Sequence, residues 1–244
     1  MNNLKSKIDY GQWGQQFTPP YCYELAGKTL KLKFELYEAS AEFVSDTELI
    51  WNGERLPYWC LKATNRVYLI CFGLPSNRCV TLIADIETKL VTLDETAFDE
   101  VEKPYKSAVD FGTIAVDGES APTELHAFTT ELADNRFLWI FCETYWHVES
   151  YTETECTHIC NYPEFNGAGQ PYQAVKITDT LYWVINQDAH ESICMLYNLA
   201  NMTSVGRSVV YQSAKTPVAQ GAIGAFSDTI EPPAIPTVVQ LTAA

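Results

Sequence analysis

The stretch 139–160 carries the densest set of aromatic and ionisable side chains in the sequence. Alternate residues of an extended strand point to the same side. Four residues of this stretch share one side in that geometry: Tyr145, His147, Glu149 and Tyr151. A partly desolvated carboxylate or imidazole can titrate near neutral pH, as general acid–base catalysis requires. We therefore expect His147 and Glu149 to exchange protons with a ligand, and Tyr145 to donate a hydrogen bond to it.

The same alternation allows a second interpretation, in which His147 and Glu149 lie on a solvated outer face while Trp146 and Val148 fill the core. Under the first interpretation, aromatic side chains form the substrate-binding wall of a pocket. The residues expected in that wall are Trp139, Phe141, Tyr151, Tyr182 and Trp183.

Two further positions have open roles. Tyr182 has a counterpart, Tyr68, in an internal repeat, so a packing tyrosine common to both copies is the alternative to a binding role. Asp188 is a fourth catalytic candidate. It lies in the polar segment 186–191, which is either a plain hairpin turn or a turn at a pocket mouth that reaches the ligand.

A metal site and a bound cofactor are not expected. Cys156, His158 and Cys160 would project to one side of a strand, with His147 or Glu153 as a fourth ligand, but this spacing matches no strong zinc signature. The chain also has no phosphate-binding loop, no dinucleotide fingerprint and no Gly-x-Ser-x-Gly nucleophile motif. Catalysis, if present, would therefore depend on side chains alone.

An internal repeat organises the chain around these candidates. The segment 57–68 shares Pro, Tyr, Lys, Thr and Tyr with the segment 171–182, which lies 114 positions later. A second match pairs Leu30, Leu32 and Phe34 with apolar residues 107 positions later, namely Phe137, Trp139 and Phe141. Two matches in the same order indicate a duplication.

Each copy is expected to form short antiparallel strands. Residues 29–36 alternate between apolar and charged side chains, and turn signals such as Asn52-Gly53 separate further short runs. This pattern predicts an all-β fold with tandem lipocalin- or calycin-like antiparallel barrels. The expected divisions are a first barrel at 1–105, a linker at 106–124, a second barrel at 125–212 and an irregular tail at 213–244.

The tandem layout resembles the family of molybdenum cofactor biosynthesis protein F (MoaF), which is assigned to the calycin or lipocalin-like barrels. The similarity spans about residues 24–211. The motifs that carry it are residues 25–28, 81–85, 111–112, 126–132 with Arg136, 145–147, 181–182 and 202–206. The resemblance implies the barrel fold and a ligand-facing His147. This sequence departs from the family pattern at three positions. The family has glycine in place of Asp134, tyrosine in place of Glu149 and glutamate in place of Asp188.

The charge balance restricts the partners. The formal net charge is −15, which disfavours both a nucleic-acid backbone and an anionic membrane surface. Residues 1–14 contain no apolar signal segment, so we expect a cytoplasmic protein whose eight cysteines are reduced thiols. The expected partner is a small hydrophobic organic molecule, and a homodimer is left open.

These observations lead to two hypotheses from different classes. The first is a cofactor-free isomerase, cyclase or lyase that acts on a small apolar substrate by proton transfer, with specialised metabolite biosynthesis as one setting for it. The second is a non-catalytic carrier or sensor of a hydrophobic ligand. Burial of His147 and Glu149 would favour the enzyme, and their exposure would favour the carrier.

Overall fold

The computed structural model describes residues 16–75, 77–98, 105–142, 145–160, 166–187, 191–210 and 219–227. All regular elements in this part of the chain are strands. Eight of them form the first barrel: β1 (Thr29–Phe34), β2 (Glu38–Phe43), β3 (Glu48–Trp51), β4 (Glu54–Lys62), β5 (Val67–Leu74), β6 (Arg78–Asp85), β7 (Leu90–Phe98) and β8 (Tyr105–Ala115). Each pairs with the next in antiparallel register, and β8 pairs with β1 to close the barrel.

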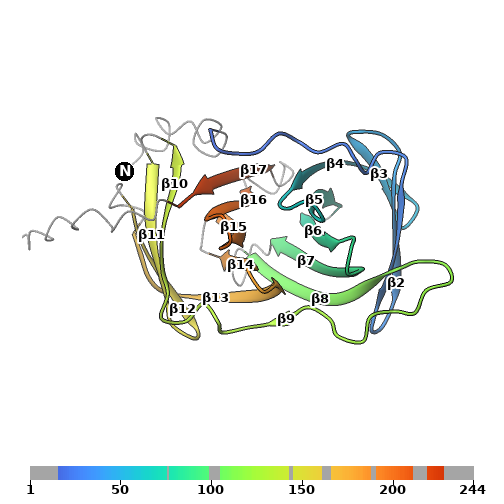
Figure 1. The fold of residues 1–244 in the computed structure, drawn as a ribbon. Helices are drawn as coiled ribbons and strands as arrows, with labels where there is room; N and C mark the ends of the chain where they lie inside the picture. Colours follow the sequence, from blue (N-terminus) through green and yellow to red (C-terminus); the bar gives the residue numbers. More distant parts are fainter. Residues whose placement is uncertain are drawn as a thin grey trace, which may run out of the picture.

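The second half repeats this closed arrangement. Its strands are β9 (Ala127–Phe128), β10 (Arg136–Cys142), β11 (Tyr145–Tyr151), β12 (Glu155–Cys160), β13 (Gly167–Thr178), β14 (Leu181–Gln187), β15 (Glu191–Asn198), β16 (Thr203–Val210) and β17 (Ala219–Phe226). Strands β10 to β17 close through the β10–β17 pair, and the short β9 adds to β13. The prediction of two antiparallel barrels in tandem is confirmed, and Figure 1 shows them side by side. Among the described elements, no helix is long or apolar enough to cross a membrane.

The boundaries of the two units differ from the expected ones. Strand β8 occupies most of the expected linker 106–124, and β17 lies inside the expected tail 213–244. Both strands are needed to close a barrel. β17 has only two large apolar residues, and β8 mixes its apolar residues with small and charged ones. A Cβ atom on Gly112 would lie 2.6 Å from the carbonyl oxygen of Lys33, and one on Gly224 would lie 2.6 Å from that of Phe17. Close backbone approach selects small residues there, and this removes the usual strand signal.

The duplication is visible in repeated contacts before each barrel. Glu24 accepts hydrogen bonds from the Lys62 ammonium and the Tyr68 hydroxyl. Its counterpart Glu131 does the same, at 2.9 Å from the Lys176 ammonium and 2.8 Å from the Tyr182 hydroxyl. The offsets between these counterparts are the same 107 and 114 positions found in the sequence repeat.

The turn before each barrel also repeats, although its residue type differs between the two copies. Gly27 has a φ of 76°, and its counterpart Asp134 has a φ of 61°. Asn, Asp and Gly are the residues that adopt this left-handed region most readily, so the aspartate preserves the turn. The backbone N–H of each residue donates to an equivalent carbonyl, that of Phe43 or Tyr151.

The barrels pack against each other through the same face of each repeat. Five pairs of equivalent residues meet in one buried apolar cluster: Leu61 and Val175, Val67 and Leu181, Leu69 and Trp183, Cys71 and Ile185, and Ile83 and Leu196. In Figure 1 this places β5–β7 opposite β14–β16. An interface in which both partners use the same patch is isologous, so the barrels are related as the halves of a two-fold symmetric dimer.

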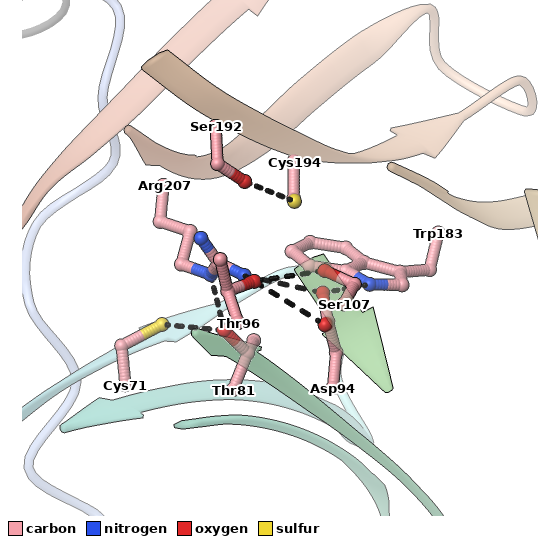
Figure 2. A network of polar contacts seen from close by, with 9 residues as sticks. All are labelled: Cys71, Thr81, Asp94, Thr96, Ser107, Trp183, Ser192, Cys194 and Arg207. Carbon is pink, nitrogen blue, oxygen red and sulfur yellow. Dashed lines mark hydrogen bonds and ion pairs between the residues drawn. The ribbon is translucent and has the colours of Figure 1, made fainter. Parts of the chain in front are cut away.

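A buried polar network crosses this interface (Figure 2). The Arg207 guanidinium donates to Asp94 Oδ2 at 3.2 Å and to Thr96 Oγ1 at 2.6 Å, and it also donates to Thr81. Trp183 Nε1 donates to the same Asp94 oxygen at 3.1 Å. Thr81 and Cys194 are equivalent positions, because they pair with the equivalent residues Cys71 and Ile185. Thr81 pairs in turn with Asp94, and Cys194 pairs with Arg207, so Asp94 and Arg207 are themselves equivalent positions.

Candidate active site in the second barrel

The predicted residues of β11 lie inside the second barrel. His147 and Glu149 are buried, with 7% and 4% of their surface exposed. Register places His147 between Trp139 of β10 and Cys160 of β12, and it places Glu149 opposite His158. The interpretation in which His147 and Glu149 form a solvated outer face is therefore wrong for this structure.

Glu149 is the centre of a polar cluster in an otherwise aromatic interior. Its Oε2 accepts a hydrogen bond of 2.6 Å from the Tyr151 hydroxyl and a second from the Tyr197 hydroxyl. Its Oε1 lies 3.5 Å from His147 Nε2. Two donors on one oxygen hold the carboxylate in place and leave the other oxygen facing the imidazole.

Burial determines the protonation of the groups around Glu149. It raises the pKa of both Tyr151 and Tyr197 well above the ordinary value, and the nearby carboxylate raises each further. Burial also lowers the pKa of His147, an effect that Glu149 opposes and His158 reinforces. At neutral pH the cluster therefore contains two protonated phenols and a neutral imidazole.

Among the buried polar atoms of this interior that have no hydrogen-bond partner in the described part of the chain, two lie next to the cluster. They are His147 Nε2 and Trp139 Nε1. The Trp139 side chain is fully buried, and its ring centroid lies 4.5 Å from that of Tyr197. An unpaired buried donor or acceptor costs about 1–3 kcal/mol. Such groups are uncommon in folded proteins, and a catalytic role or a bound water or ion is among the explanations for them.

The first barrel lacks this cluster at the equivalent positions. Register matches Trp139, His147, Glu149, Tyr151 and Tyr197 with Leu32, Ala39, Ala41, Phe43 and Ala84. All five counterparts belong to the apolar core of the first barrel. Duplication alone would produce two similar interiors, so the polar groups are specific to the second copy.

Tyr197 is the member of the cluster that the sequence-based prediction missed. It lies on β15, more than forty residues from Glu149 along the chain. One signal could have found it. When the strands of the two copies are aligned, Tyr197 stands where the first copy has Ala84, so the two copies differ at this position.

The remaining predicted residues divide between the site and other places. The ring of Phe141 meets His147 edge-on at 4.7 Å, and Tyr145 lies 5.8 Å from the same ring. Tyr182 belongs to the interior core but binds Glu131 at the barrel end. Trp183 points the other way, into the interface between the barrels. Asp188 lies outside the described residues.

A hollow of about 350 Å³ lies beside this interior. Phe128, Thr130 and Tyr172 are among its lining residues. The Tyr172 ring packs against Tyr151 at 4.8 Å, and Tyr151 in turn binds Glu149. The hollow therefore approaches the carboxylate through two tyrosine rings.

The cysteine and histidine side chains near the site do not form a metal centre in this structure. Within the described ranges, no group of three or more His, Cys, Asp or Glu side chains is placed to hold an ion. The His147 and His158 ring centroids are 6.3 Å apart. All eight cysteines are buried and present as thiols.

The comparisons with known proteins add no family to this description. No family model matches the sequence, and the search of curated proteins found no match. The two closed eight-stranded barrels are compatible with a calycin-like fold, and the likeness to MoaF rests on short sequence motifs alone.

Proposed function

We propose that the second barrel is a cofactor-free acid–base catalyst for a small, largely apolar organic substrate. The reaction type would be isomerisation, cyclisation or elimination. The observation that carries the proposal is Glu149, a buried carboxylate 3.5 Å from a buried imidazole and bound by two phenols, in a barrel whose twin has alanine there. Strongly perturbed ionisable groups in an enclosed apolar site are typical of catalytic centres.

Each group in the cluster suits one role in proton transfer. Glu149 is the base that removes a proton from the substrate and returns it at another atom, so that no oxidant or second reactant is needed. Tyr151 and Tyr197 are protonated donors that can hydrogen-bond an oxygen on which negative charge develops. His147 is neutral and can receive or supply the proton beside Glu149.

A carrier of a hydrophobic ligand is the second candidate. It is favoured by the packing of the interior, where Tyr151 and Tyr172 stand between the hollow and Glu149. In that case the tyrosine–glutamate cluster would stabilise the barrel, and the bound molecule would leave unchanged.

Incubation with a metabolite extract of the source cells, followed by chromatography and mass spectrometry, separates the two. An isomerase gives a product of equal mass at a new retention time, and a lyase gives two smaller masses. We expect Glu149→Gln to abolish conversion, because glutamine can still accept hydrogen bonds from the phenols but cannot take a proton. His147→Ala should also abolish conversion, with circular dichroism showing an intact barrel.

Glu155→Gln is the matched control, because Glu155 is exposed on β12 and should not affect conversion. Equal conversion by wild type and Glu149→Gln would refute the catalytic role. A compound that co-purifies with the protein and is recovered unchanged from both would favour the carrier.

A further inference from the structure

The first barrel has a hollow of its own, at the end where the chain turns from β3 into β4. Its volume is about 440 Å³, and its lining residues come from strands β3 to β8 and from Tyr37 just before β2. Because six consecutive strands contribute, the hollow is the mouth of the barrel rather than a groove on its side. Barrel mouths of this size commonly hold small molecules.

The inner wall of this mouth is apolar and aromatic. Trp51 and Leu93 line it and are 8% and 5% exposed. The Trp51 ring is held against Phe72 at a centroid distance of 5.1 Å. Tyr37 lies at the rim and stacks on Phe34 at 4.8 Å, so both lining rings are packed into place.

The rim of the mouth is acidic. Glu54, Glu95 and Asp110 line it together with one cationic side chain, Arg78. The Arg78 guanidinium lies 3.1 Å from Glu95 and neutralises that carboxylate. Asp110 accepts a 2.7 Å hydrogen bond from the neutral Tyr37 hydroxyl, which orients it without cancelling its charge. The lining therefore has an excess of two negative charges over an aromatic base.

We propose that the mouth of the first barrel binds a small organic cation, a primary or quaternary ammonium compound. A tryptophan or tyrosine face attracts such a cation through its quadrupole, and carboxylates at the rim supply the opposite charge. A neutral apolar ligand would gain nothing from Glu54 and Asp110, and an anion would be repelled by them.

The mouth of the second barrel is built differently. At the positions equivalent to Trp51, Glu95 and Asp110 it has His158, Ser208 and Ile223. The cation site is thus specific to the first copy, as the glutamate cluster is specific to the second. It stands independently of the proposed catalytic function.

Isothermal titration of the full chain with choline tests the proposal, with 3,3-dimethylbutan-1-ol as a neutral compound of the same shape. We expect saturable binding of one choline per chain, and binding of the alcohol weaker by about tenfold or more. Asp110→Asn should weaken choline binding by about tenfold, because one rim charge is removed. Added salt should weaken it as well.

Asp46→Asn is the control, since Asp46 lies in the exposed β2–β3 turn at the opposite end of the barrel and should leave binding unchanged. Trp51→Leu, checked for folding by circular dichroism, should weaken choline more than it weakens the alcohol. The proposal is overturned if choline does not bind saturably, if the alcohol binds equally well, or if Asp110→Asn binds choline as wild type does. Glu149→Gln should bind choline normally, which separates this site from the catalytic one.

Discussion

The ion pair between Arg207 and Asp94 allows a quantitative test of how the barrels are joined. Both side chains are fully buried, so neither charge is compensated by solvent. Arg207→Met keeps most of the side-chain volume but leaves Asp94 with neutral partners, of which the nearest is Trp183 at 3.1 Å. Breaking a buried pair on one side costs about 3–5 kcal/mol. That is a large part of the roughly 5–15 kcal/mol by which a domain is typically stable.

The double-mutant cycle isolates the pairing. Asp94→Asn alone leaves the Arg207 charge buried, with the hydroxyls of Thr81 and Thr96 as its acceptors. In the double variant no buried charge remains, so its cost should be lower than the sum of the two single costs by about 2 kcal/mol or more. Urea unfolding of the wild type and the three variants, followed by tryptophan fluorescence and by circular dichroism, gives the three changes in the free energy of unfolding.

Arg55→Met is the matched control for the arginine substitution. Arg55 pairs with Glu48 at 3.3 Å, but both side chains are about half exposed. A surface pair of this kind contributes about 1 kcal/mol or less. If Arg207→Met costs no more than Arg55→Met, or if the single costs add to within about 0.5 kcal/mol, the interface does not depend on this charge pair.

Two further predictions concern protonation. Burial lowers the pKa of His126 to about 4, so the folded protein keeps a neutral imidazole where the unfolded chain binds a proton below about pH 6.5. Stability should therefore fall as the pH is lowered through this window. Between about pH 7.5 and 5, the loss should be larger in wild type than in His126→Gln by roughly 2 kcal/mol. Equal losses of unfolding free energy in urea would contradict this. Hydrogen bonds from Lys62 and Lys176 lower the pKa of Glu24 and Glu131. Lys62→Met and Lys176→Met should each raise the pKa of the partner carboxylate in a carbon-13 titration, and a response in only one would refute the equivalence of the two motifs.

The local pattern of the sequence determined the strands and the repeat. In β1 the apolar residues alternate with charged ones, and the structure buries every second residue. The same alternation placed His147 and Glu149 on one side of β11, where the structure has them together. Alternation has this power because successive side chains of a strand point to opposite faces, whatever the strand pairs with.

Which face is the interior was decided only by the tertiary structure. Six consecutive residues of β5 are buried, because one face lines a barrel and the other meets the second barrel. A strand buried on both sides loses its period, so the sequence could not tell that Tyr182 faces inward and Trp183 faces the interface. Tyr197 reaches Glu149 by barrel closure, a contact between distant strands that no local pattern encodes. Closure by β8 and β17 was missed for the same reason. Gly112 and Gly224 are needed because another backbone approaches closely there, and a glycine gives no local signal for a strand.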